Sequence, residues 1–598
     1  MSLDIALTSL ERAQIVRLLG PALEADLGTA YRFKHSLTQD AAYRSLSRRQ
    51  RQHVHRQVAR CYEELFAGRL DEHAAVLAHH YGAAGDDDKF LEFSQRAGDA
   101  ALRVYATSEA VAHYERAIEA ALAMSPPPGE QLIHLYNQRG RAMELASRQD
   151  EALAGYAEME RQAQALGLHA MELAAIISQA LLRCTATALF DPDAGWLLVA
   201  QALELAERLG DRAAEARILW VRCNLNRLSG NLDPALQDAE ASLAIARELG
   251  LREQVAYTLN DMGYILQMTR DQARVVEVNK EAAAYWREAD NLAMLADSLG
   301  GSVWSQYALG NLDQAVAASD EAYAISVRIG NEWGQSFSRM LVGMVHLDLG
   351  NLGQALAAMD TSLEKAEESG FSIPRAMVPP QKALLLTLLG DYAGARAVLR
   401  PVLTGEAGAL PESMEFAFAA YIEILLAEGN VEEASEWLAS FDMDSYEQAN
   451  LGFIVMGVGT VIRYFLATGQ AKLALETSDS HVATLREFGL RAVWPEGLLL
   501  QARALDALGR TDEAGRSLEE ARQSAETLGN RRVLWEIQAA LAERANDRDE
   551  ATRLWRDADA VVAYLADRAP SPGLRASFLV RPSVERIRSM AAAGDPTQ

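Results

Sequence analysis

Cysteine is scarce in this chain of 598 residues. The three cysteines, Cys61, Cys184 and Cys223, are far apart in sequence and form no C-x-x-C pair. This scarcity excludes a disulfide framework and a cysteine-based zinc site, and it favours a reducing compartment. No basic segment followed by an apolar segment stands near the first residue, so a signal peptide is not expected. We therefore predict a cytoplasmic protein.

Positive charge is also in the minority. The sequence has 57 lysines and arginines against 83 aspartates and glutamates, which gives a net charge of −26. Such a chain repels phosphate groups, so binding to nucleic acid or to an anionic membrane surface is not expected. The most apolar run, residues 451–467, is short for a membrane span and contains Arg463. The expected partners are proteins or peptides.

Motifs for catalysis and metal binding are missing as well. Six of the eleven histidines fall in the first 80 residues, but no H-E-x-x-H motif occurs. His53 and His55 are two residues apart, and on a helix such residues do not face together. We therefore predict a structural role for these histidines, with no metal, no cofactor and no enzymatic activity. The six are His35, His53, His55, His73, His79 and His80.

Glycine and alanine recur with a fixed period. One set of glycines is spaced by 39 or 40 residues, with a single step of 80 where Arg270 replaces the expected glycine. An alanine stands five residues after each of these glycines. Five residues after Arg270 the corresponding residue is Val275, which is the one exception. Spacing of this kind is the signature of a repeat architecture. The glycines are Gly230, Gly310, Gly350, Gly390, Gly429, Gly469 and Gly509.

A second set of glycines lies half a period away from the first. Between the two sets, apolar residues recur at intervals of three and four, which is helical periodicity. Glycine ends a helix well because it tolerates the left-handed backbone conformation. The sequence therefore predicts an all-α fold, a right-handed α-solenoid of about twelve helix pairs. The second set is Gly210, Gly250, Gly330, Gly370, Gly489 and Gly529, with Asn291 in one slot.

The glycine–alanine segments resemble the inter-helix turn of tetratricopeptide repeats. Examples are LGNLDQA (309–315), LGNLGQA (349–355) and LGDYAGA (389–395), and Gly263 and Gly343 match the preceding glycine of that motif. The period is longer than the usual 34 residues. It resembles the long-helix variant in the sensor arms of STAND-type signal-transduction ATPases.

The N-terminal segment strengthens this resemblance. Phe33, His35 and Leu37 match an F-x-H-x-L element that closes a winged-helix-like domain in STAND ATPases, and an arginine-rich helix follows. The closest resemblance is to bacterial predicted ATPases that accompany nucleotide cyclases. We expect a winged-helix-like remnant with linking helices, then the solenoid, then a capping tail. Their predicted ranges are 1–95, 96–567 and 568–598.

The resemblance implies a regulatory function without catalysis. Members of the family carry a P-loop upstream, but no Gly-Lys dipeptide occurs in this sequence, so G-x-x-x-x-G-K-[ST] is absent. The chain is expected to be a protein-interaction and ligand-sensing arm of a bacterial signal-transduction regulator linked to a cyclase or to transcription. Its nucleotide-binding ATPase module would be on another chain or missing from this one. The alternative is a free-standing tetratricopeptide scaffold that assembles other proteins.

Residues 41–60 contain six arginines and no acidic residue. A solvated basic face, a dock for an acidic surface and a DNA contact are the three interpretations. In the resembling family the matching helix contacts the ATPase module, which implies an interdomain basic face here. Its residues are Arg44, Arg48, Arg49, Arg51, Arg56 and Arg60.

The first helix of each pair is expected to line the concave surface, as in tetratricopeptide solenoids. Aromatic residues interleaved with amides on that surface suit a peptide groove, although packing between helices would also explain the aromatics. Farther along, Glu423, Arg463 and Arg503 occupy the same slot, which makes the surface more polar. The predicted groove residues are Trp220, Asn224, Arg227, Tyr257, Asn260, Asp261, Tyr264, Gln267, Trp304, Tyr307, Phe337 and Met340.

Two prolines stand out within one repeat unit. Pro379 and Pro380 fall in the first helix of that unit. Because proline lacks the backbone N–H that a helix interior needs, we expect this helix to be shortened.

Overall fold

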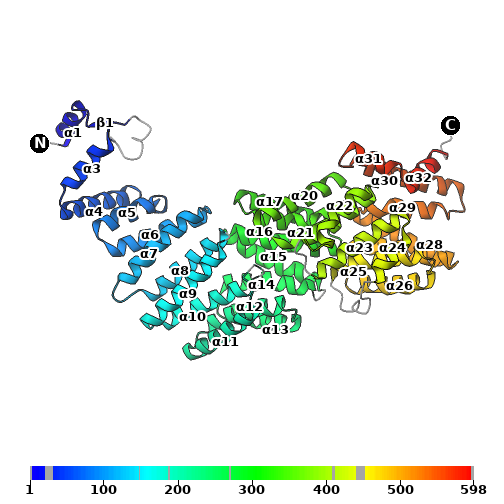
Figure 1. Ribbon diagram of the computed structural model, residues 1–598, viewed down its shortest axis with the longest axis horizontal. Helices are drawn as coiled ribbons and strands as arrows, with labels where there is room; N and C mark the ends of the chain where they lie inside the picture. The colour runs from blue at the N-terminus through cyan, green and yellow to red at the C-terminus, as the bar shows by residue number, and fades with distance from the viewer. Residues whose placement is uncertain are drawn as a thin grey trace. The chain divides into compact units, whose positions relative to one another are not determined.

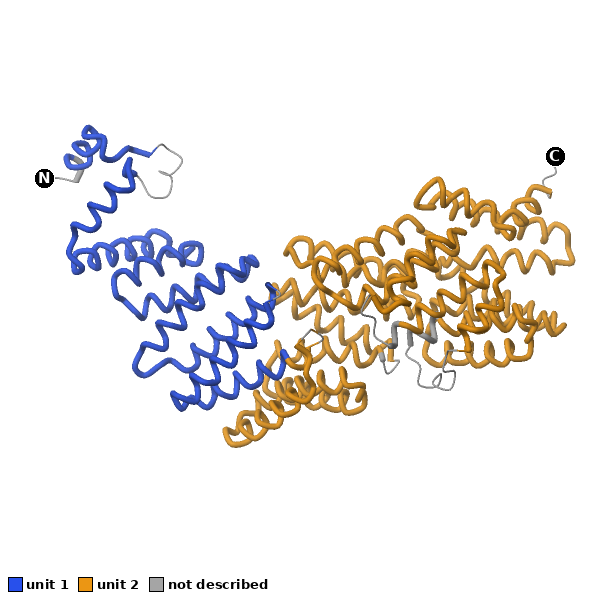
Figure 2. Tube along the Cα trace, in the orientation of Figure 1, with its two compact units in different colours: residues 1–182 blue, residues 183–598 orange. Residues whose placement is uncertain are grey.

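The computed structural model describes residues 3–19, 31–146, 148–185, 187, 189–268, 271–406, 411–439 and 451–593. Arg270, the predicted substitute for a turn glycine, lies outside these residues. The chain divides into two compact units, residues 1–182 (unit 1) and residues 183–598 (unit 2) (Figure 2). Within the described part, no helix has both the length and the apolar character needed to cross a membrane.

Unit 1 begins with short elements and continues as helix pairs (Figure 1). Its two strands are antiparallel, with Val16 opposite Phe33. The short helices and the two-stranded sheet are the elements that a winged-helix-like remnant would retain. In order, unit 1 has α1 (Leu3–Arg12), β1 (Val16–Leu18), β2 (Tyr31–Phe33), α3 (Ser36–Ser45), α4 (Arg48–Leu65), η1 (Leu70–His73), α5 (Ala74–Ala84), α6 (Asp87–Arg103), α7 (Thr107–Ala123), α8 (Gly129–Leu145), α9 (Gln149–Leu166) and α10 (His169–Arg183).

Unit 2 consists of helices throughout its described residues. It comprises α11 (Pro192–Leu209), α12 (Arg212–Leu228), α13 (Leu232–Glu248), α14 (Arg252–Met268), α15 (Gln272–Glu288), α16 (Leu292–Ala308), α17 (Leu312–Arg328), α18 (Glu332–Met340), α19 (Val342–Asp348), α20 (Leu352–Ser369), α21 (Ser372–Leu388), α22 (Tyr392–Leu403), α23 (Pro411–Glu428), α24 (Val431–Ala439), α25 (Leu451–Ala467), α26 (Ala471–Glu487), η3 (Arg491–Val493), α27 (Trp494–Ala507), α28 (Thr511–Leu528), α29 (Arg531–Ala542), α30 (Arg548–Asp567), α31 (Pro572–Leu579) and α32 (Pro582–Ala593).

This helix order confirms the predicted all-α solenoid. Consecutive helices from α6 to α30 match twelve repeat units of two helices each, with α18 and α19 together forming the first helix of one unit. The turn glycines have left-handed backbone angles, as at Gly310 (φ 82°) and Gly330 (φ 66°). One detail differs, because Asp290 (φ 52°) holds the left-handed position and the side chain of Asn291 instead accepts a hydrogen bond from the Met294 N–H. The predicted segments 1–95, 96–567 and 568–598 stay predictions.

The expected shortening of the helix around Pro379 and Pro380 was wrong. Helix α21 runs over 17 residues with both prolines inside it, and both are buried. Val378 and Leu385 of this helix belong to a large apolar cluster. Because most helical stability in proteins comes from tertiary packing of this kind, the helix persists despite two missing backbone donors.

Some first helices carry a glycine against which their second helix packs. A Cβ atom at four such glycines would come closer than 3.0 Å to a side chain sixteen residues later. Only glycine therefore allows these helices to approach as they do. The sequence motif identified two of the four, Gly263 and Gly343. The four contacts are Gly98 with Tyr114, Gly140 with Tyr156, Gly263 with Asn279, and Gly343 with Met359.

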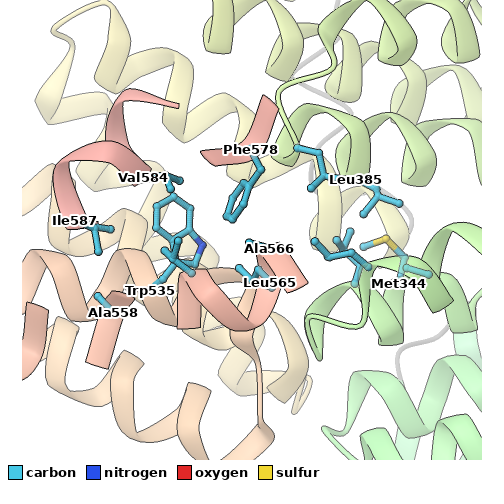
Figure 3. Close-up of a cluster of buried hydrophobic side chains, with 14 of the residues drawn as sticks. Met344, Leu385, Trp535, Ala558, Leu565, Ala566, Phe578, Val584 and Ile587 are labelled. Carbon is cyan, nitrogen blue, oxygen red and sulfur yellow. The ribbon is translucent and has the colours of Figure 1, made fainter. Parts of the chain in front are cut away.

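The solenoid of unit 2 turns back on itself. Met344 of α19 and Leu385 of α21 share one buried cluster with Trp535 of α29 and with Phe578 of α31 (Figure 3). Backbone atoms also meet across this contact, where the Gly353 N–H donates to the carbonyl oxygen of Arg568 at 2.9 Å. Helices about 190 residues apart in sequence are thus joined by an apolar seam.

Candidate functional site

A cavity of about 390 Å³ lies inside this closed turn of unit 2, and we call it the inner chamber. Its wall comes mainly from the first helices of successive pairs, α16, α19, α21, α23, α25, α27 and α29. Leucines, alanines, valines and Met344 form the apolar part of the wall. The polar wall residues are Tyr307, Thr387, Glu423, Thr460, Arg463, His481, Glu496, Arg503, Arg532, Glu536 and Arg581.

A chain of ion pairs crosses one side of the inner chamber. Arg463 donates to Glu423 at 2.9 Å and also to Glu496. Arg532 donates to the other oxygen of Glu496 at 2.6 Å and to Asp348 at 2.5 Å. Because Asp348 belongs to α19 and Arg532 to α29, this network also joins the two ends of the closed turn.

A second group of charges lies beside this chain. Arg503 donates to Glu536 at 2.5 Å, and Arg581 donates to the backbone carbonyl oxygen of Leu388 at 2.6 Å. Burial would raise the pKa of Glu536, but Arg503, Arg463 and Arg581 together lower it. This part of the wall therefore places Arg581, whose hydrogen bond goes to a backbone carbonyl oxygen, beside the Arg503–Glu536 ion pair.

Burial and charge set the ionisation of the ion-pair chain. Burial raises the pKa of Asp348, although Arg532 and the Tyr307 hydroxyl act in the opposite direction. Burial would also raise the pKa of Glu496, but Arg532 and Arg463 outweigh it and hold that pKa well below its usual range. The wall thus keeps Glu496 ionised between two arginines at neutral pH.

His481 of α26 is the one histidine on the wall. Burial lowers the pKa of His481 to about 4, so the ring is neutral at neutral pH. Its Nδ1 atom is buried and makes no hydrogen bond with the described residues. His481 therefore adds a neutral ring to the wall rather than a charge.

The twelve residues predicted to form a peptide groove all lie on first helices, namely α12, α14, α16 and α18. Their polar groups bond mostly between successive first helices. Trp220 Nε1 and Asn224 Nδ2 donate to Asp261 at 2.6 and 2.7 Å. Tyr264 donates to Asp297 at 3.1 Å, in the same direction along the solenoid. These hydrogen bonds tie one first helix to the next.

Burial separates the predicted groove residues into two sets. Trp220, Asn224, Asn260, Tyr307 and Met340 are buried, and Tyr307 also lines the inner chamber. The other seven are half-buried and keep part of their surface accessible. These are Arg227, Tyr257, Asp261, Tyr264, Gln267, Trp304 and Phe337.

The six predicted arginines of the basic face lie on α3 and α4. Arg51 is half-buried and stacks over the ring of Tyr43, 5.3 Å from its centroid. Arg56 is half-buried and donates to the backbone carbonyl oxygen of Ala84 at 3.2 Å. The remaining four are exposed. They are Arg44, Arg48, Arg49 and Arg60.

The sequence identified only part of the inner chamber. The sequence shows Glu423, Arg463 and Arg503 at one repeat position, and these three residues do line the wall. Glu496 and Glu536 were missed, although they repeat the same step of 40 residues and so carried a usable signal. Arg532 and Arg581 of the wall, and Asp348, which bonds to Arg532, were missed because only closure of the turn brings them together.

Comparisons with known proteins complete this description. No protein-family model and no curated protein sequence matches the chain. Among solved structures, it is similar to a Rap protein complexed with competence and sporulation factor, with a TM-score of 0.42, 12% identity, and 67% of this chain and 99% of that chain covered. It is also similar to the APC/C hetero-tetramer Cut9–Hcn1, with a TM-score of 0.41, 14% identity, and 92% and 99% covered.

Proposed function

We propose that this chain is a non-enzymatic sensing arm that takes up an anionic ligand in the inner chamber of unit 2. The observation that carries the proposal is Arg581 on the chamber wall, which bonds to the backbone carbonyl oxygen of Leu388 and lies beside the Arg503–Glu536 ion pair. A volume of about 390 Å³ falls in the range of small-ligand pockets. A carboxylate or phosphate group would bind Arg581 and share Arg503 with Glu536, since arginine binds such groups by paired N–H donors.

Ligand uptake would act on the closed turn. The chamber wall and the contact between α19 and α29 share Arg532, which bonds both Glu496 and Asp348. A ligand that bonds to the arginines of the wall would compete with these ion pairs. It would therefore bind with different affinities to the turn with the α19–α29 contact formed and to the turn with that contact broken. Such differential affinity is what shifts a conformational equilibrium.

The test is a thermal-shift and calorimetric screen of the full chain against phosphate, citrate, glutamate and acidic peptides. At least one anion is expected to bind the wild-type chain and to bind Arg503→Gln at least tenfold more weakly. Arg247→Gln is the matched control, because Arg247 also pairs with a glutamate in unit 2 but lies on the exposed surface. The proposal fails if no anion binds, or if Arg503→Gln and the control bind it equally.

We propose further that the arm serves a STAND-type signal-transduction regulator. The resemblance of residues 31–65 to that family supports this context, and the exposed arginines on α3 and α4 suit an acidic docking surface. The N-terminal segment would then transmit the state of the arm to a nucleotide-binding module on another chain. A P-loop ATPase encoded beside this gene should co-purify with the chain, and Arg48→Glu with Arg49→Glu should disrupt the complex. Intact co-purification would exclude this docking face.

The half-buried aromatic residues on α14 to α18, with Gln267 among them, support a second binding surface, for an extended peptide. This surface would also serve the alternative function, a free-standing scaffold. A Trp304→Ala, Tyr264→Ala double variant should lose peptide or partner binding while its circular dichroism spectrum remains helical. Undiminished affinity would remove this surface from consideration.

A further inference from the structure

Three histidines that are separated in sequence meet in unit 1. His55 lies on α4, and His79 and His80 lie on α5. One ring nitrogen from each of them falls within 4.8 Å of the other two. We call these three residues the histidine cluster. His53, which the sequence paired with His55, is exposed and is not part of this cluster.

The hydrogen bonds of His55 orient its ring. Its Nε2 atom lies 3.0 Å from the hydroxyl oxygen of Tyr43 on α3, and its Nδ1 atom lies 2.8 Å from Nδ1 of His80. When Nε2–H donates to the tyrosine oxygen, Nδ1 carries a bare lone pair. Histidines that ligate metals almost always have this arrangement, with the second nitrogen donating to an oxygen atom.

The rings of the three histidines also lie against one another. The centroid of the His55 ring is 5.7 Å from that of His79 and 5.1 Å from that of His80, and the centroids of His79 and His80 are 5.2 Å apart. A metal ion requires each imidazole to be deprotonated at the nitrogen that binds it.

We propose that His55, His79 and His80 form a binding site for a Zn²⁺ ion. Three imidazole ligands with water in the fourth position are an established zinc arrangement. The cluster itself offers no carboxylate oxygen, and Arg51 lies close by over the ring of Tyr43. Imidazole nitrogens bind transition-metal ions without help from negative charge, whereas Ca²⁺ and Mg²⁺ require oxygen ligands.

Modest side-chain movements complete the site. Ligand nitrogens about 2.0–2.1 Å from a tetrahedral zinc ion lie roughly 3.4 Å from one another. The nitrogens of His55 and His80 must therefore separate slightly, and the most distant pair must approach. The side chain of His79 is exposed, and its ring contacts among the described residues are with the other two members of the cluster. The bound ion would tie α4 to α5 and, through Tyr43, fix the position of α3.

The test measures metal binding to the full chain after removal of bound metal with a chelator. Titration with ZnCl₂ by calorimetry should give one equivalent bound with submicromolar affinity. CoCl₂ should give the intense visible absorption bands of tetrahedral Co²⁺. His79→Ala and His80→Ala should each weaken Zn²⁺ binding by about 10- to 100-fold or more.

Two controls isolate the cluster. His53→Ala changes an exposed histidine on the same helix α4 and should bind one equivalent of Zn²⁺ as the wild type does. Cys61→Ser removes the exposed thiol of α4 and should also leave binding unchanged. Since His79 makes no hydrogen bond to a described residue, its variant should fold even if His80→Ala does not. The proposal is overturned if the wild type binds no zinc, if His79→Ala binds as the wild type does, or if Cys61→Ser abolishes binding.

Discussion

Replacing Arg532 with methionine perturbs the ion-pair network of the inner chamber at its centre. Arg532 donates to Asp348 at 2.5 Å and to Glu496 at 2.6 Å. After Arg532→Met, Glu496 still pairs with Arg463. Asp348 has a side chain with no exposed surface, and it keeps only the Tyr307 hydroxyl, at 2.8 Å, among its described partners. The substitution therefore leaves one buried carboxylate without its counter-charge.

The expected loss of stability is about 3–5 kcal/mol, which is the range for removal of one partner of a buried ion pair. Urea unfolding followed by tryptophan fluorescence measures it, since Trp535 lies one turn away on the same helix α29. Asp348→Asn in the same background removes the unpaired charge and keeps a hydrogen-bond acceptor for Tyr307. The Asp348→Asn, Arg532→Met double variant should thus be more stable than Arg532→Met alone.

The pH dependence gives the same reasoning a second test. Burial already raises the pKa of Asp348 in the folded chain, and loss of Arg532 removes a charge that opposes this rise. A carboxyl group whose pKa is higher in the folded chain than in the unfolded chain binds more protons when the chain is folded. The contribution of this group to stability therefore falls as the pH rises from the unfolded pKa to the folded pKa. The deficit of Arg532→Met should therefore shrink as the pH falls below neutral. A loss below about 1 kcal/mol at neutral pH, or no rescue by Asp348→Asn, would refute this account.

Two further predictions concern other parts of the chain. Gly140→Ala should destabilise unit 1 by about 1–3 kcal/mol in thermal or urea unfolding, because its Cβ would overlap the buried Tyr156 side chain; an unchanged midpoint would contradict the close approach of α8 and α9. In the native chain, Cys61 should be the only thiol that reacts rapidly with a disulfide reagent, because it is exposed while burial raises the pKa of Cys184 to about 12 and also raises that of Cys223. Rapid reaction of two or three thiols in the folded chain would show that the core around Cys184 and Cys223 opens.

The repeat could be predicted because its causes are local. A glycine such as Gly310 has a left-handed backbone angle in the turn, and the alanine five residues later, Ala315, is fully buried at the start of the second helix. Both requirements act within one helix pair, so they leave a periodic signal in the sequence. The exception at Pro379 and Pro380 has the opposite origin, since packing from other helices maintains α21 against the local preference.

The sequence by itself determined the helix pairs, their turns and the first-helix slots that carry Glu423, Arg463 and Arg503. Only the tertiary structure decided that the solenoid of unit 2 closes, that Asp348 meets Arg532 across 184 residues, and that His55 meets His79 and His80. The physical reason is the range of the interactions. Helix caps and turn glycines act between neighbouring residues and mark the sequence at fixed intervals, whereas closure depends on the sum of small rotations over many repeats.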